Sequence, residues 1–110
     1  MGGDDRRFGG GTDEGVATKV RRRVKRPRRY QVLLHNDDYT TMEFVVMILV
    51  TVFHRSESDA VQTMMNVHQQ GSGVAGVYTY EVAEAKVAKV GRMARESQFP
   101  LRCTMEPEET

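Results

Sequence analysis

Two separated groups of residues could together form a binding site with a polar and an apolar part. Asn36 and Asp37 follow a short apolar run. Met64, Val67 and His68 are spaced i, i+3 and i+4, which places them on one face of a helix. The alternative is that both apolar residues belong to the core and that His68 only hydrogen-bonds a turn. Residue types and spacing leave both interpretations open.

Catalysis has little support in the sequence. It contains no glycine-rich phosphate loop, HExxH motif, nucleophile elbow or CxxC pair. His35, His54 and His68 lie in different predicted elements, and an isolated histidine is more often structural than catalytic. Asp37 and Asp38 are adjacent in sequence, so their carboxylates usually point in different directions and cannot flank one bond as a catalytic pair. Both residues favour a turn. We therefore expect a binding protein without enzymatic activity, cofactor or metal ion.

The composition predicts one small domain. The chain has 110 residues, of which 39% are hydrophobic, enough for a single modest core. Its longest apolar run, residues 44–50, is far shorter than the roughly 20 residues that span a bilayer. No secretory signal is visible at the N-terminus, which favours the cytoplasm. The single cysteine, Cys103, is expected to be buried and structural.

A net charge of +1 hides a strong asymmetry along the chain. Residues 1–29 carry ten of the sixteen basic residues and only four acidic ones, so the remainder is acidic. Six of the ten glycines lie in the first fifteen residues. We predict a disordered basic tail over residues 1–28, a folded core over 29–106 and an acidic end over 107–110. The tail could bind nucleic acid or a membrane surface through phosphates, or serve only as a solvated arm.

Local patterns predict an α+β domain in the order β-α-α-β-α-β, with a three-stranded antiparallel sheet packed against three helices. Thr40 or Thr41 can cap the first helix, and Thr40 with Glu43 matches a capping box. Ser56 and Gly71 fit the two ends of the second helix. The predicted strands are 30–34, 73–80 and 101–105, and the predicted helices are 42–53, 56–71 and 81–97. The first helix is apolar nearly all round, so it should be buried on several sides or offer one face to a ligand.

Several separated motifs follow one another along the chain: LLHNDDYTTMEFV at 33–45, MMNVHQQG at 64–71, GVYTYEVAEAKV at 76–87, and ARE with PLRCT at 94–104. In this order they resemble the ClpS family. Together they cover essentially residues 30–106. The resemblance implies a small α/β sandwich and an adaptor that delivers proteins with a free N-terminal Leu, Phe, Tyr or Trp to a Clp unfoldase for degradation.

The resemblance also implies roles for individual residues. Asn36, Asp37 and His68 would hold the substrate's free α-amino group, whose three donors they can satisfy. Thr40 would contact the peptide backbone, and Met42 would act as a gate against β-branched first residues. The pocket for the first side chain would be lined by Leu34, Met42, Val45, Met64, Val67 and Leu101.

Partner contacts follow from the same resemblance. Glu81, Glu84 and Lys86 would dock on the N-terminal domain of ClpA or the related ClpC, although an ordinary solvated helix start is the plain alternative. We expect a monomer that binds neither nucleic acid nor membranes. A nucleic-acid or ribosome-associated protein using the basic tail is the competing hypothesis. Thr41 stands where the family has proline, which we expect to loosen the start of the helix.

Overall fold

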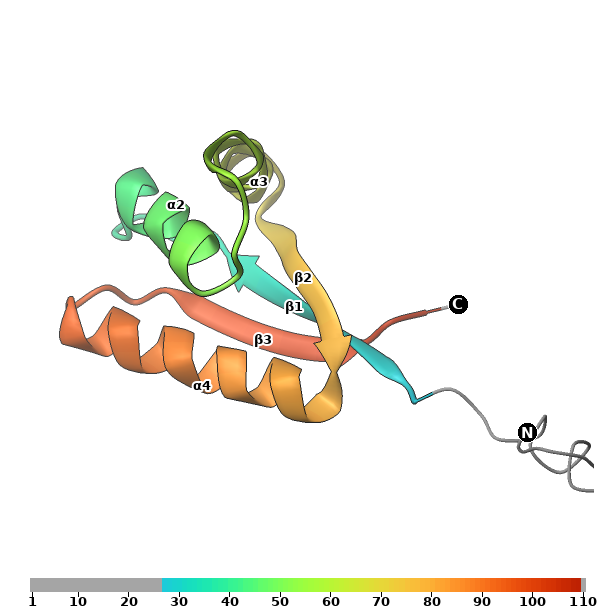
Figure 1. The fold of residues 1–110 in the computed structure, drawn as a ribbon. Helices are drawn as coiled ribbons and strands as arrows, with labels where there is room; N and C mark the ends of the chain where they lie inside the picture. Colours follow the sequence, from blue (N-terminus) through green and yellow to red (C-terminus); the bar gives the residue numbers. More distant parts are fainter. Residues whose placement is uncertain (1–26, 110) are drawn as a thin grey trace, which may run out of the picture.

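The structure, a computed structural model, describes residues 27–109, so nearly all of the predicted tail lies outside the described residues. Three strands and three helices follow in the predicted order β-α-α-β-α-β (Figure 1). Their bounds are β1 Arg29–His35, α2 Met42–Thr51, α3 Glu57–Gln70, β2 Ser72–Thr79, α4 Tyr80–Glu96 and β3 Arg102–Pro107. The α+β fold class is confirmed, and the predicted bounds differ from the observed ones by a few residues.

The sheet is antiparallel with the strand order β2-β1-β3, so the first strand occupies the centre. Its pairing with β2 contains an irregularity between Val32 and Leu33. Pairing with β3 extends to the end of that strand, and the Glu108 amide donates to the Arg29 carbonyl oxygen at 2.8 Å. The ordered sheet therefore continues slightly beyond residue 106.

All three helices contribute to one hydrophobic core. Val32 and Leu34 are fully buried on one face of the central strand, as the period of two along a strand requires. Ile48 and Leu49 of α2 and Val90 of α4 are fully buried in the same cluster. Figure 1 shows α4 alongside β3, with α2 and α3 adjacent to each other. This packing fixes the positions of the loops at the end of β1 and of α3.

The N-cap of α2 corrects one prediction. Thr41, rather than Thr40, is the cap, and its hydroxyl accepts a hydrogen bond from the Phe44 amide at 3.1 Å. Thr40 instead donates its hydroxyl to Asp37, so the predicted capping box does not form. Thr41 thus supplies a side-chain cap that proline could not, which offsets the loosening expected at this position.

The ends of α3 agree with the sequence signals. Ser56 is the N-cap, with its hydroxyl accepting from the Asp59 amide at 3.2 Å. Gly71 ends the helix in the left-handed region, at φ 91°, where a residue without Cβ is favoured. Within residues 27–109, no helix is long and apolar enough to cross a membrane.

Candidate functional site

Asp37 organises the loop between β1 and α2. Its Oδ1 accepts hydrogen bonds from the amides of Tyr39 at 2.8 Å and Thr40 at 2.7 Å. The Thr40 hydroxyl donates to Oδ2 at 2.7 Å. A carboxylate offers about four acceptor positions, so these three bonds leave one, on Oδ2. Asp37 can therefore hold the loop in shape and still accept a hydrogen bond from a ligand.

The asparagine of the site is tied to the end of the helix that carries the histidine. The Asn36 amide donates to the carbonyl oxygen of Gly71 at 2.9 Å, and the Gly71 amide donates to the carbonyl oxygen of Val67 at 2.9 Å. His68 lies within this last turn of α3. The first of these bonds joins residues more than thirty positions apart, and the second closes the helix turn that carries His68. Asn36 and His68 both remain exposed.

These elements enclose a cavity of about 460 Å³. One part of its wall is polar and includes Asn36, Asp37, Thr40 and His68. The other part is apolar and comes from α2 and α3. The apolar lining residues are Met42, Val45, Met64 and Val67. Polar acceptors beside an apolar wall suit a ligand that is charged at one end and hydrophobic at the other.

Met42 is the most accessible apolar residue of this wall. Its side chain is 44% exposed, whereas Val45, Met64 and Val67 are buried. As the first residue of α2, it follows directly after the loop that Asp37 organises. A flexible side chain at this position can adjust to what enters the cavity.

Two of the six predicted pocket residues do not line the cavity. Leu34 is fully buried in the sheet, and Leu101 is 7% exposed just before β3. Both belong to the core cluster that supports the cavity. In this structure Leu34 and Leu101 pack in the core cluster together with the residues that line the cavity.

Electrostatics favour an ionised Asp37. Burial raises the pKa of Asp37. Hydrogen bonds from the backbone and side chain of Thr40 and from the Tyr39 amide lower this pKa by more than burial raises it. The net result is a pKa below the ordinary value for a carboxyl group. Asp37 therefore presents a negative charge to the cavity at neutral pH.

The predicted docking residues lie on α4, away from the cavity. Glu81 and Glu84 are exposed near its start. Lys86 is half-buried, and its Nζ donates to the carbonyl oxygen of Val52, at the end of α2, at 2.7 Å. The same Nζ lies 5.7 Å from the ring centroid of Phe53 and 5.2 Å from that of Tyr78. Lys86 thus joins α4 to the helix that lines the cavity, a structural contact that sequence reasoning missed.

Other reactive side chains are embedded in the sheet. Burial raises the pKa of the Cys103 thiol to about 12, so it is protonated at neutral pH. The pKa of His35 is lowered by burial and by the nearby Arg102, and its Nε2 is 2.7 Å from the Thr104 hydroxyl. Within residues 27–109, no group of three or more His, Cys, Asp or Glu side chains is placed to hold a metal ion.

The fold and the cavity define a small α+β binding domain. Comparison with known proteins identifies its family. The model described as ATP-dependent Clp protease adaptor protein ClpS matches residues 25–104, and the chain belongs to this family. Its function is therefore that of a protease adaptor, not of an enzyme.

Individual relatives are similar in sequence to this chain over most of their length. A ClpS adaptor from Myxococcus xanthus is 60% identical over 89 residues, which cover 81% of this chain and 83% of the relative. One from Maricaulis maris is 58% identical over 94 residues, 86% of each chain. The structure of Agrobacterium tumefaciens ClpS2 bound to L-phenylalaninamide is similar with a TM-score of 0.73 and 43% identity, covering 76% of this chain and all of that chain.

Proposed function

We propose that this adaptor binds proteins through a free N-terminal Leu, Phe, Tyr or Trp and delivers them to a Clp unfoldase. The observation that carries the proposal is the cavity in which Asp37 and His68 face the same space as an apolar wall. The bound L-phenylalaninamide of the Agrobacterium relative has both a free amine and an aromatic side chain, which supports this ligand class.

Recognition of the amine follows from its hydrogen-bonding capacity. A protonated α-amino group has three N–H donors and no acceptor. Asp37, Asn36 and His68 offer a carboxylate, an amide oxygen and a ring nitrogen on the polar wall. An acetylated or internal peptide nitrogen has one donor and no charge, so it leaves the carboxylate without its partner. The site should therefore distinguish a chain end from the interior of a chain.

The side-chain preference follows from the apolar wall. Burying a Leu or Phe side chain there contributes roughly 1.5–3 kcal/mol, and each charged hydrogen bond contributes a similar amount. After the cost of association, we expect about micromolar affinity, which permits both selection and release. We propose that Thr40 contacts the peptide backbone and that Met42, at the cavity mouth, disfavours side chains branched at Cβ.

A panel of peptides that differ only in the first residue tests this proposal. We expect binding for Leu, Phe, Tyr and Trp, weak binding for Ile and Val, and at least tenfold weaker binding after acetylation of the Leu peptide. Calorimetry on the full chain gives all of these affinities. Equal affinity for the free and acetylated peptides would contradict amine recognition.

Delivery requires a second surface, which we propose on the exposed start of α4. Glu81 and Glu84 present two carboxylates there, and Lys86 follows on the same helix, so we propose that these three residues dock on the N-terminal domain of ClpA or ClpC. Reversing the charge of Glu81 or Glu84 to Lys should weaken unfoldase binding while leaving peptide affinity unchanged. Glu96→Lys at the far end of α4 is the matched control. Equal binding by all three variants would place docking elsewhere.

The basic N-terminal segment gives a third test. Every residue that lines the cavity lies between Asn36 and His68 in the sequence. Removal of residues 1–26 should therefore leave peptide affinity unchanged within about twofold. We propose that this segment acts in delivery by the monomeric adaptor in the cytoplasm. Degradation of a Leu-initiated substrate should then fall sharply with the truncated protein. Unchanged degradation would make the segment dispensable, and loss of peptide binding would make it part of the site.

A further inference from the structure

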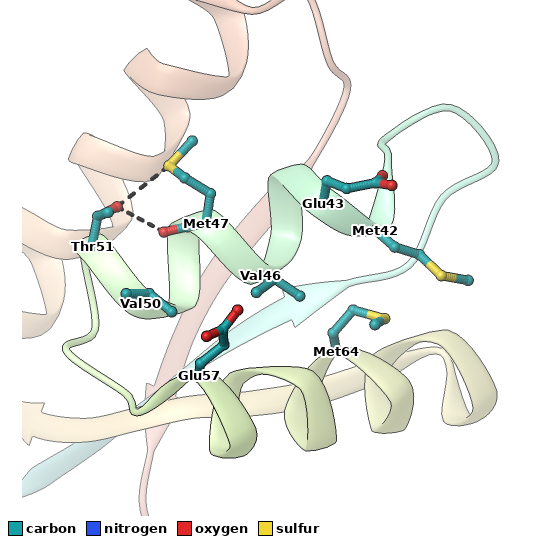
Figure 2. Close-up of a pocket in the computed structure, with 8 residues that line it drawn as sticks. All are labelled: Met42, Glu43, Val46, Met47, Val50, Thr51, Glu57 and Met64. Carbon is teal, nitrogen blue, oxygen red and sulfur yellow. Dashed lines mark hydrogen bonds between the residues drawn. The ribbon is translucent and has the colours of Figure 1, made fainter.

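A second apolar depression lies between α2 and α3, with a volume of about 600 Å³. Figure 2 shows Val46 and Val50 pointing from α2 toward α3, and Glu57 and Met64 pointing back from α3. The complete lining, which we call the α2–α3 groove, is Met42, Glu43, Val46, Met47, Val50, Thr51, Glu57 and Met64. This groove explains why the helix at 42–51 is apolar on more faces than the core requires.

The groove leaves apolar surface in contact with solvent. Met42 is 44% and Met47 is 37% exposed, and Val46 and Val50 are only half-buried. In the part of the chain that the structure describes, no segment lies over them. Contiguous exposed apolar surface on a small protein commonly marks an interaction site.

The groove is continuous with the amine-binding cavity. Met42, Glu43 and Met64 line both spaces, so the second begins where the first ends. From Met42 to Thr51 the helix rises ~13.5 Å, at about 1.5 Å per residue. An extended peptide covers that length with about four residues, at ~3.4 Å each. A chain held by its first residue therefore has room for the next four residues along the groove.

Charge in the groove selects among such chains. Glu43 lies at the cavity end and Glu57 at the other, both exposed, and the lining residues include no basic side chain. Two carboxylates flanking an apolar strip favour a segment with apolar residues followed by a basic one, and disfavour acidic residues.

We propose that the α2–α3 groove binds the four residues that follow the first residue of a substrate, with apolar side chains at alternate positions and a basic residue directly after these four. The inference rests on the proposed function, because the first residue must occupy the neighbouring cavity. In an extended segment only alternate side chains face the groove. The preference for apolar residues should therefore apply either to positions two and four of the substrate or to positions three and five.

The test compares ligands that share the first residue and differ downstream. L-phenylalaninamide has no downstream residue and reports the cavity alone. Three Phe-initiated peptides ending in lysine carry serine at positions two to five, valine at positions two and four, or valine at positions three and five. We expect one valine peptide to bind about fivefold more tightly than the serine peptide, equivalent to ~1 kcal/mol.

Two variants assign this gain to the groove. Val50→Ser should remove most of it while leaving L-phenylalaninamide affinity unchanged, and Val74→Ser, at an exposed valine on β2, is the matched control. Glu57→Lys, a change at an exposed residue outside the core, should weaken binding of both lysine-ending valine and serine peptides. Equal affinity for all three peptides, with L-phenylalaninamide still bound, would overturn the groove proposal and leave the proposed function intact. Failure to bind L-phenylalaninamide and every peptide would overturn both.

Discussion

Replacement of Asp37 by Asn separates the charge of this residue from its role in the loop. The asparagine side-chain oxygen can still accept from the amides that Oδ1 binds at 2.8 and 2.7 Å. The Thr40 hydroxyl can rotate to accept from the new amide group at the Oδ2 position. Loop geometry should therefore survive, and what is lost is the negative charge and the free acceptor position on Oδ2 beside the bound amine.

The magnitude follows from the kind of bond that is lost. A hydrogen bond to a charged group contributes about 1.5–3 kcal/mol, and the partial exposure of this loop favours the lower end. We expect Asp37→Asn to weaken binding of a Leu-initiated peptide about tenfold. Asp37→Ala should weaken it further, because three loop hydrogen bonds disappear as well.

Calorimetry on both variants measures the effect, and Asp38→Asn is the matched control, since it removes an exposed carboxylate of the same cavity lining one position away. The lowered pKa of Asp37 adds a pH signature. The stabilisation from its carboxylate is fully present above the unfolded-state pKa and is lost as the pH falls through the lower folded-state value. Peptide affinity should fall in the same acidic range. Wild-type affinity in Asp37→Asn, or an equal loss in Asp38→Asn, would refute a direct contact between Asp37 and the amine.

Four further outcomes are expected. Met42→Ala should open the cavity mouth and admit Ile or Val as first residue; continued exclusion in the peptide panel would assign the selection to another wall residue. Gly73→Ala would place a Cβ 2.8 Å from the Val67 side chain, so a thermal melt should show that the free energy of unfolding falls by about 1–3 kcal/mol. An unchanged melting temperature would mean that α3 shifts to make room for the new Cβ at no cost in stability. Lys86→Met should lower the melting temperature as well as any unfoldase affinity, because a main-chain carbonyl and two aromatic rings lose their partner; a purely docking role would leave stability unchanged. Cys103 should resist iodoacetamide in the folded protein at pH 8 and react after denaturation, as mass spectrometry can show; rapid labelling of the folded chain would contradict its burial and raised pKa.

Local features of the fold were readable from the sequence because they depend on near neighbours. The order of strands and helices follows from hydrophobic periods of about 2 and 3.6 residues. Ser56 and Gly71 marked the ends of α3 because capping depends on hydrogen bonds within one turn. The choice between Thr40 and Thr41 was not decided locally, because Asp37 competes for the Thr40 hydroxyl.

The candidate site was only partly predictable. Asn36, Asp37 and His68 were named from family motifs, and the structure places them on one cavity. Leu34 and Leu101 were assigned to the pocket, but both are buried in the core. Apolar character alone does not tell which side of a wall a residue faces, since core and cavity lining use the same side chains.

The sequence by itself determined the α+β class, the strong helix ends and the set of polar residues able to accept from an amine. Only the tertiary structure decided that the Asn36 amide meets the Gly71 carbonyl, that Lys86 reaches the end of α2, and that this helix leaves Val46 and Val50 half-exposed. Those outcomes depend on contacts between residues distant along the chain. Their geometry is set when the helices pack on the sheet, and no period or cap within one segment encodes it.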